Sequence, residues 1–144
     1  MCIEIHSMTS RTGLVAFLAQ TEQEKLFGKE LLEAIFEGYT HSADMESALS
    51  VKSTDYIFLV EQDGSLVAAA HVRECKGDSV LIRHMGVKEG YRGCGIGSYM
   101  LNFACQWCGE RYYKEAYLFA KCGTEQFYVK HQFVYFDPFH VRVL

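Results

Sequence analysis

The chain has little proline and no long apolar run. One proline stands against twelve glycines in 144 residues, which excludes collagen-like and proline-rich linker sequences. Hydrophobic residues make up 49% of the chain and aromatic residues 14%, and this content excludes intrinsic disorder. A chain of this length buries about two thirds of the surface that it exposes when unfolded. We therefore expect one folded domain, covering residues 1–144, that needs no disulfide or metal to fold.

The sequence also lacks the patterns typical of a membrane-spanning segment and of a secretory leader. The longest apolar run, at 14–19, has six residues, whereas a membrane span needs about twenty. The first residues lack a basic stretch followed by an apolar core and a cleavage site. We expect a soluble, cytoplasmic protein with no membrane partner, whose six cysteines are reduced by default.

An excess of basic residues is absent as well, since the formal net charge is −4. The first 60 residues carry a net charge of −5, and the remaining residues carry a net charge of +1. Proteins that bind nucleic acid present a basic face, so no nucleic-acid partner is expected. The acidic half favours a cationic partner such as a small amine, although such carboxylates can equally well only solvate a helix face.

Hydrophobic periodicity predicts an order of helices and strands. Thr21 and Glu24 form a capping-box pattern that opens an amphipathic helix ending near Gly38. Asp63-Gly64 is a turn signal between two apolar, β-prone runs. The expected strands are 2–6, 56–61, 66–74, 80–87, 116–120 and two runs flanking Asp137-Pro138; the expected helices are 21–38, 43–49, 96–110 and 124–131.

A glycine-rich loop lies between the run ending at Val87 and the helix from Ile96. Backbone N–H groups at a helix N-terminus point at whatever the loop holds, and glycines allow a diphosphate to approach closely. A Walker loop would need a lysine after Gly97, where Ser98 and Tyr99 stand. A dinucleotide fingerprint would need a third glycine at Ser98. Both of these readings fail, and an anion site of another kind remains.

The hexapeptide 92–97, Arg-Gly-Cys-Gly-Ile-Gly, matches the pattern Arg/Gln-x-x-Gly-x-Gly/Ala, with Val87 five residues before it. Downstream, Phe-Tyr-Val-Lys-His-Gln-Phe at 127–133 is similar to Phe-Tyr-x-Lys-x-Gly-Phe, with Gln132 in place of the glycine. Together the two segments resemble the GNAT superfamily of acyl-CoA-dependent N-acetyltransferases. The order of elements agrees from about Asp55 to the C-terminus.

The resemblance implies an α/β (α+β) fold with a central mixed, mostly antiparallel sheet of six to seven strands flanked by about four helices. Two strands, 80–87 and 116–120, are expected to splay apart and hold acetyl-CoA as the cosubstrate, with no metal. The residues implied for the pantetheine arm are Met85, Gly86 and Val87, and those for the pyrophosphate are Arg92, Gly93, Cys94, Gly95, Ile96, Gly97 and Ser98. Lys88, Lys121 and Lys130 are further candidates for phosphate contacts.

The reaction needs a base and an acid. Deprotonating an alkylammonium of pKa ~10.4 near pH 7.4 costs about 4 kcal/mol. Tyr128 is the candidate general acid, because a phenol can protonate a departing thiolate. No carboxylate lies on strand 80–87, where period two places Leu81, Arg83, Met85 and Val87 on one face and Ile82, His84 and Gly86 on the other. His84 is the candidate base, and His71, Glu74 or a water chain are its alternatives.

The cysteines of the Cys105-Gln106-Trp107-Cys108 segment resemble a redox or zinc pattern, but they lie late in a helix that we expect to be buried. A zinc site that also uses Cys122 and His131 has unusual spacing.

We expect an N-acetyltransferase acting on a small cationic amine, with the acidic helix 22–37 beside the acceptor cleft. The alternatives are a protein or peptide amino group as acceptor, and a non-catalytic acyl-CoA-binding module. A homodimer is left open.

Overall fold

A computed structural model describes residues 7–9, 13–36 and 50–144. The expected strand at 2–6 and the expected helix at 43–49 lie outside these residues.

The capping box is confirmed: the Glu24 N–H donates to Thr21 Oγ1 (3.1 Å), and the Thr21 N–H donates to Glu24 Oε1 (3.1 Å). None of the helices in this part of the chain combines the length and the apolar character needed to cross a bilayer.

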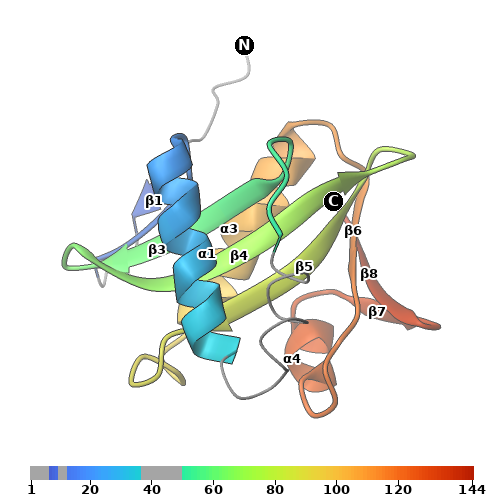
Figure 1. Cartoon of the computed structure of the whole chain (residues 1–144). Coiled ribbons are helices and arrows are strands. Elements are labelled where there is room, and N and C mark those ends of the chain that lie inside the picture. Colours follow the sequence, from blue (N-terminus) through green and yellow to red (C-terminus); the bar gives the residue numbers. More distant parts are fainter. Residues whose placement is uncertain (1–6, 10–12, 37–49) are drawn as a thin grey trace.

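The described residues form one eight-stranded sheet in the order β1-β2-β3-β4-β5-β6-β8-β7 (Figure 1). All neighbouring strands are antiparallel except β5 and β6, which are parallel, so the expected mostly antiparallel sheet is confirmed. The strands are β1 (Ser7–Thr9), β2 (Leu14–Leu18), β3 (Tyr56–Gln62), β4 (Ser65–Cys75), β5 (Ser79–Val87), β6 (Glu115–Leu118), β7 (Val134–Phe136) and β8 (Phe139–Val143). The described helices are α1 (Glu22–Phe36), α3 (Ile96–Glu110) and α4 (Glu125–Lys130).

Strand β2 was not predicted from the sequence. Its residues are continuously apolar and lack the alternation of a half-buried strand, because both faces of β2 are covered. Leu14 and Ala16 pack in the core on the α3 side, and Phe17 packs on the α1 side. The short strand β1 pairs with β2 in turn, which brings the sheet to eight strands instead of six to seven.

The sheet separates two cores (Figure 1). Helix α3 covers one face through residues such as Met100, Phe103 and Trp107, which pack on Phe58 and its neighbours. Helix α1 crosses the other face over β3, β4 and β5. It approaches closely at Gly28, where a Cβ would stand 2.6 Å from Ile57 Cγ2.

Strands β5 and β6 separate after a short stretch of pairing. They are paired only at Ser79–Leu81 with Glu115–Tyr117, whereas β5 continues to Val87. The expected splay between these strands is therefore confirmed. The free second half of β5 leads into the glycine-rich loop and α3, and it leaves backbone groups available to a ligand in the gap.

Candidate functional site

The loop between β5 and α3 is shaped by glycines with positive φ. Gly90, Gly93 and Gly95 have φ of 91°, 78° and 82°, a region that residues with a Cβ avoid. The Tyr91 N–H donates to the Lys88 carbonyl (3.0 Å), and Arg92 Nε donates to the Val87 carbonyl (3.0 Å). These contacts fold the loop back so that it closes over the end of β5.

The first backbone amides of helix α3 donate no hydrogen bond to a capping side chain. Gly95 is the N-cap residue and has no side chain to accept a hydrogen bond, and the first turn contains no acidic residue. The first N–H groups of a helix have no intrahelical acceptor, and the helix dipole adds partial positive charge there. A Cβ built at Gly93 or Gly95 meets nothing within 4 Å, so the space above this turn is open. Such a turn could bind an anion through its backbone amides.

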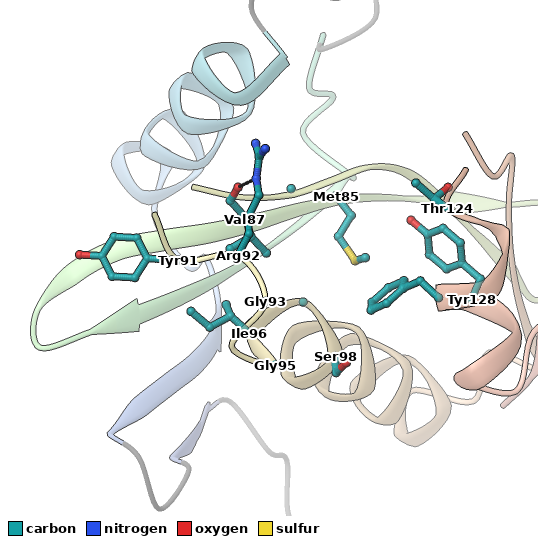
Figure 2. A pocket seen from close by; sticks show the side chains of 13 residues that line it. Met85, Val87, Tyr91, Arg92, Gly93, Gly95, Ile96, Ser98, Thr124 and Tyr128 are labelled. Carbon is teal, nitrogen blue, oxygen red and sulfur yellow. Dashed lines mark hydrogen bonds between the residues drawn. The ribbon is translucent and has the colours of Figure 1, made fainter. Parts of the chain in front are cut away.

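A pocket of about 520 Å³ opens at this turn. Figure 2 shows Met85 and Tyr128 pointing into it from opposite sides, from β5 and α4. The lining is Met85, Gly86, Val87, Tyr91, Arg92, Gly93, Gly95, Ile96, Gly97, Ser98, Thr124, Phe127 and Tyr128. Every residue predicted to hold the cofactor lines this pocket except Cys94, whose thiol turns back toward the Arg92 carbonyl (3.7 Å). The sequence analysis gave no site role to Tyr91, Thr124 or Phe127. Tyr91 directly precedes the first motif, Phe127 begins the second, and Thr124 lies three residues before it.

A second pocket of about 390 Å³ adjoins the first and shares Met85, Gly86, Val87 and Arg92 with it. Its remaining lining consists of Ile35, Phe36, Lys121 and Cys122. Helix α1 therefore reaches the site with its apolar C-terminal end. None of its described carboxylates lines either pocket; the helix borders the second pocket through Ile35 and Phe36.

The three lysines considered for phosphate lie in different places. Lys121 lines the second pocket, and its ammonium stands 5.4 Å from the Phe36 ring centroid, a cation–π distance. Lys88 and Lys130 are exposed and line neither pocket. The groups at this turn that could bind an anion are therefore backbone amides and Arg92 more than lysines.

Tyr128 is held by the end of α4. Burial raises the pKa of its hydroxyl, and its ring packs edge-on against Phe127 and Phe133. The Phe133 N–H donates to the Tyr128 carbonyl (3.1 Å) and the Gln132 N–H to the Val129 carbonyl (3.2 Å), which together form a Schellman motif. Gln132 adopts φ of 71°, the conformation that a glycine takes at this position. The missing glycine has therefore not changed the shape of the helix end.

The predicted faces of β5 are wrong beyond Ile82. A bulge at this point pairs His71 with His84 but Val72 with Ile82, so β5 carries one extra residue, Arg83. As a result Ile82 and Met85 both face α3, although period two had placed them on opposite faces. Gly86 faces α1, where a Cβ would stand 2.9 Å from Ile35 Cγ2.

His84 lies on the α1 side of β5 and lines neither pocket. Its ring meets Phe36 edge-on (5.9 Å between centroids) and stacks on His71 (6.1 Å). Burial, and then the charges of His71, Arg83 and Arg73, lower the pKa of His84 to about 4. The ring is therefore neutral at pH 7.

The alternative bases are engaged elsewhere. His71 Nε2 lies 2.7 Å from Asp55 Oδ2, and Arg73 donates to both oxygens of this carboxylate at 2.8–2.9 Å. Burial lowers the pKa of His71, and these partners hold the pKa of Asp55 well below its usual range despite burial. Glu74 interacts with Tyr113 at the far end of β4.

The cysteines of α3 are part of the core. Cys105 and Cys108 are buried, and burial raises the pKa of both thiols, that of Cys105 to about 11. Cys122 is exposed in the segment after β6. Among the described residues, no three His, Cys, Asp or Glu side chains lie close enough to hold a metal ion.

The profile of the acetyltransferase (GNAT) domain matches residues 53–135, more than half of the chain. The chain belongs to the GNAT acetyltransferase family. No curated protein matches the sequence at a significant level.

Solved GNAT structures share the fold of this chain at low sequence identity. A GNAT acetyltransferase from Staphylococcus aureus superposes with a TM-score of 0.71 at 17% identity, covering 90% of this chain and 99% of that one. A GNAT acetyltransferase from Elizabethkingia anophelis with acetyl-CoA bound gives 0.70 at 12%, covering 93% and 100%. The ribosomal-protein-S18-alanine N-acetyltransferase from Escherichia coli gives 0.70 at 12%, covering 89% and 93%.

Proposed function

We propose that this GNAT acetyltransferase transfers an acetyl group from acetyl-CoA to a primary amine, by direct attack of the amine in a ternary complex. The observation that carries the proposal is the open amide turn at Gly95–Ser98, which lies in a pocket that continues into a second one. The two pockets meet at Met85, Gly86 and Val87. A thioester held there would be within reach of an acceptor from the α1 side.

The residues of the first pocket fit CoA. Open amides and Arg92 complement a diphosphate, and the positive-φ glycines leave no side chain in its way. The free backbone of β5 at Met85–Val87 suits the amide groups of a pantetheine arm. A backbone N–H on this stretch would polarise the thioester carbonyl as charge develops on its oxygen.

Tyr128 is the proposed general acid. It lines the first pocket opposite Met85, and its raised pKa keeps the hydroxyl protonated at pH 7. When the amine attacks and the carbon–sulfur bond breaks, the hydroxyl gives its proton to the departing thiolate of CoA. The resulting phenolate is reprotonated from solvent or from the proton that the amine releases.

His84 is the proposed base. The ring is neutral and borders Phe36, which lines the second pocket. Because His84 itself lines neither pocket, the proton of the amine would have to reach it along a chain of water molecules. Its pKa of about 4 lies far below that of an ammonium, so His84 would not retain the proton at pH 7 and would release it to solvent. His84→Gln is expected to lower kcat/KM for the amine and to leave acetyl-CoA affinity unchanged.

For the acceptor we propose a small cationic amine. The described carboxylates of α1 are not in contact with the pocket, so the acidic surplus of the first 60 residues acts over a distance, by raising the local concentration of cations. A protein amino group is the alternative, because the related fold from Escherichia coli belongs to an enzyme named for acetylating the alanine of ribosomal protein S18.

The experiment supplies acetyl-CoA with three acceptor pools: polyamines and diamines, free amino acids, and peptides with free N-termini. Mass spectrometry then identifies acetylated products. We expect products from the first pool and a KM that rises with ionic strength. Products from peptides alone would transfer the assignment to a protein acceptor. Binding of acetyl-CoA without any product would leave an acyl-CoA-binding module and overturn the proposed activity.

A further inference from the structure

A hydrogen bond joins the first turn of α3 to the end of α4. Ser98 Oγ lies 2.9 Å from His131 Nε2. Ser98 is the third residue of α3 and lines the first pocket, whereas His131 is the C-cap residue of α4 and lines neither pocket. The Ser98 hydroxyl therefore links His131 to the pocket.

His131 is held in place by contacts with three elements. Its ring meets the Phe127 ring of α4 edge-on, with 4.8 Å between centroids. Arg142 Nη1 of β8 donates to the His131 carbonyl (3.3 Å) and also to Asn102 Oδ1 of α3 (3.3 Å), four residues after Ser98. The ring thus reaches Ser98 from a position that α3, α4 and β8 fix together.

The Ser98 hydroxyl has one proton to donate and two lone pairs that accept. If His131 Nε2 is the acceptor, the proton goes to His131 and the hydroxyl offers only lone pairs to the pocket, which repel an anion. If Nε2 carries a hydrogen, it donates to Ser98 Oγ, and the O–H is free to donate into the pocket. An anion in the pocket selects the second arrangement, because a hydrogen bond to a charged acceptor is the stronger one.

We propose that His131 positions the Ser98 hydroxyl for acetyl-CoA: His131 Nε2–H donates to Ser98 Oγ, and the Ser98 O–H donates to a phosphate oxygen of the cofactor. This role rests on the proposed function, which puts the pyrophosphate at this turn. His131 is a positioning residue, because it acts through Ser98. It also connects the phosphate turn to the helix of the general acid, since the His131 N–H donates to the Tyr128 carbonyl (3.0 Å).

The proposed arrangement makes cofactor binding depend on pH. Burial, and then the charges of Arg142 on β8 and Lys130 on α4, lower the pKa of His131 in the free chain. From α3 the ring faces the uncharged Ser98, and Tyr128 in the same turn stays neutral because burial raises its pKa. A phosphate beside Ser98 stabilises the protonated ring and raises the pKa of His131. The chain then takes up protons on binding, so acetyl-CoA affinity should rise as the pH falls through about 6.5.

Calorimetric titration with acetyl-CoA, in the absence of an amine, tests this role at several pH values between about 5.5 and about 8. Ser98→Ala should weaken binding by about 10- to 150-fold, the range for a hydrogen bond to a charged group. His131→Leu should weaken binding by about 2- to 12-fold, the range for a neutral hydrogen bond, and should reduce the pH dependence. The double variant should lose little more than Ser98→Ala alone, because His131 acts through Ser98.

His131→Gln is the conservative variant. Its side-chain amide can donate to Ser98 Oγ at every pH, so it should retain most of the affinity that His131→Leu loses, with a flatter pH profile. The titration of the cofactor's own phosphates is the same for every variant and cancels in the comparison. Gln106→Leu is the matched control, because Gln106 lies eight residues after Ser98 on α3, contacts Glu110 (3.4 Å) and lines neither pocket. It should leave the affinity and its pH dependence unchanged.

Circular dichroism and thermal unfolding establish that each variant is folded. Equal affinity in the natural chain and in His131→Leu overturns the role of His131 and leaves the cofactor in its pocket. Losses that add in the double variant also overturn it, because His131 then acts independently of Ser98. So does a pH profile that is the same in His131→Gln as in the natural chain. A natural chain that does not bind acetyl-CoA at any pH overturns the proposed function, and this role with it.

Discussion

Substitutions at Gly97 should separate the stability of the fold from the binding of acetyl-CoA. Gly97 lies in the first turn of α3, and a Cβ built there would stand 3.6 Å from both Phe127 and Val87, which is ordinary contact. The protein can therefore accept the methyl group. Alanine is better than glycine in a helix by about 1 kcal/mol, so the melting temperature should rise by about 2–4 °C.

The same methyl group enters the first pocket, because Gly97, Val87 and Phe127 all line it. The motif admits alanine as well as glycine at position 97, so this methyl group should change acetyl-CoA affinity little. The larger side chain of Gly97→Leu should cost about 1–3 kcal/mol, which corresponds to a loss of roughly 5- to 150-fold in affinity. Calorimetric titration measures the affinity, and thermal unfolding without ligand measures the stability.

Gly109→Ala is the matched control for this experiment. Gly109 lies in the same helix, and its Cβ would also meet a neighbour at 3.6 Å, in this case Leu144, but it lies outside both pockets. It should show a similar gain in stability and unchanged affinity. If Gly97→Leu binds acetyl-CoA as tightly as the natural chain does, the cofactor does not pass over the first turn of α3 and the assignment of the first pocket is wrong.

Three further changes have definite expected outcomes. Tyr128→Phe should lower kcat by about 10²- to 10⁴-fold in steady-state assays with unchanged acetyl-CoA affinity; an unchanged kcat would remove Tyr128 from the mechanism. Gln132→Gly should stabilise the protein by about 0.5–1 kcal/mol in denaturant unfolding, because Gln132 has φ of 71°; destabilisation would contradict the assigned Schellman turn. The pKa of His84 is lower in the folded chain than in the unfolded one, so the unfolding free energy should fall as pH drops from about 6.5 to about 4. His84→Gln should flatten this slope, and an identical slope would contradict the assigned burial of His84.

The glycine-rich loop could be predicted because its chemistry is local. Gly93 and Gly95 are needed for a backbone with positive φ directly before a helix, and this requirement is visible in the order of residues. Val87 likewise marks the end of β5 in the sequence as it does in the structure. The strands after Asp55 were placed well for a similar reason, since turn residues separate runs with clear β character.

Features that depend on tertiary packing could not be predicted in this way. The bulge at Arg83 changes which face each residue of β5 occupies, and nothing in the residue types announces it. Strand β2 reads as a plain apolar run because both of its faces are covered. The acidic character of α1 led us to expect this helix beside the acceptor cleft, but it could not tell which turn comes near: the turn of α1 that reaches the second pocket is the apolar one with Ile35 and Phe36.

The measurement that tests the central claim most directly is the rate of CoA thiol release from acetyl-CoA by the natural chain, with and without a primary amine. We predict release that depends on the amine, saturates with both substrates, and yields one acetylated amine for each thiol released. A chain that binds acetyl-CoA but releases thiol at the same slow rate with and without every amine would contradict the account.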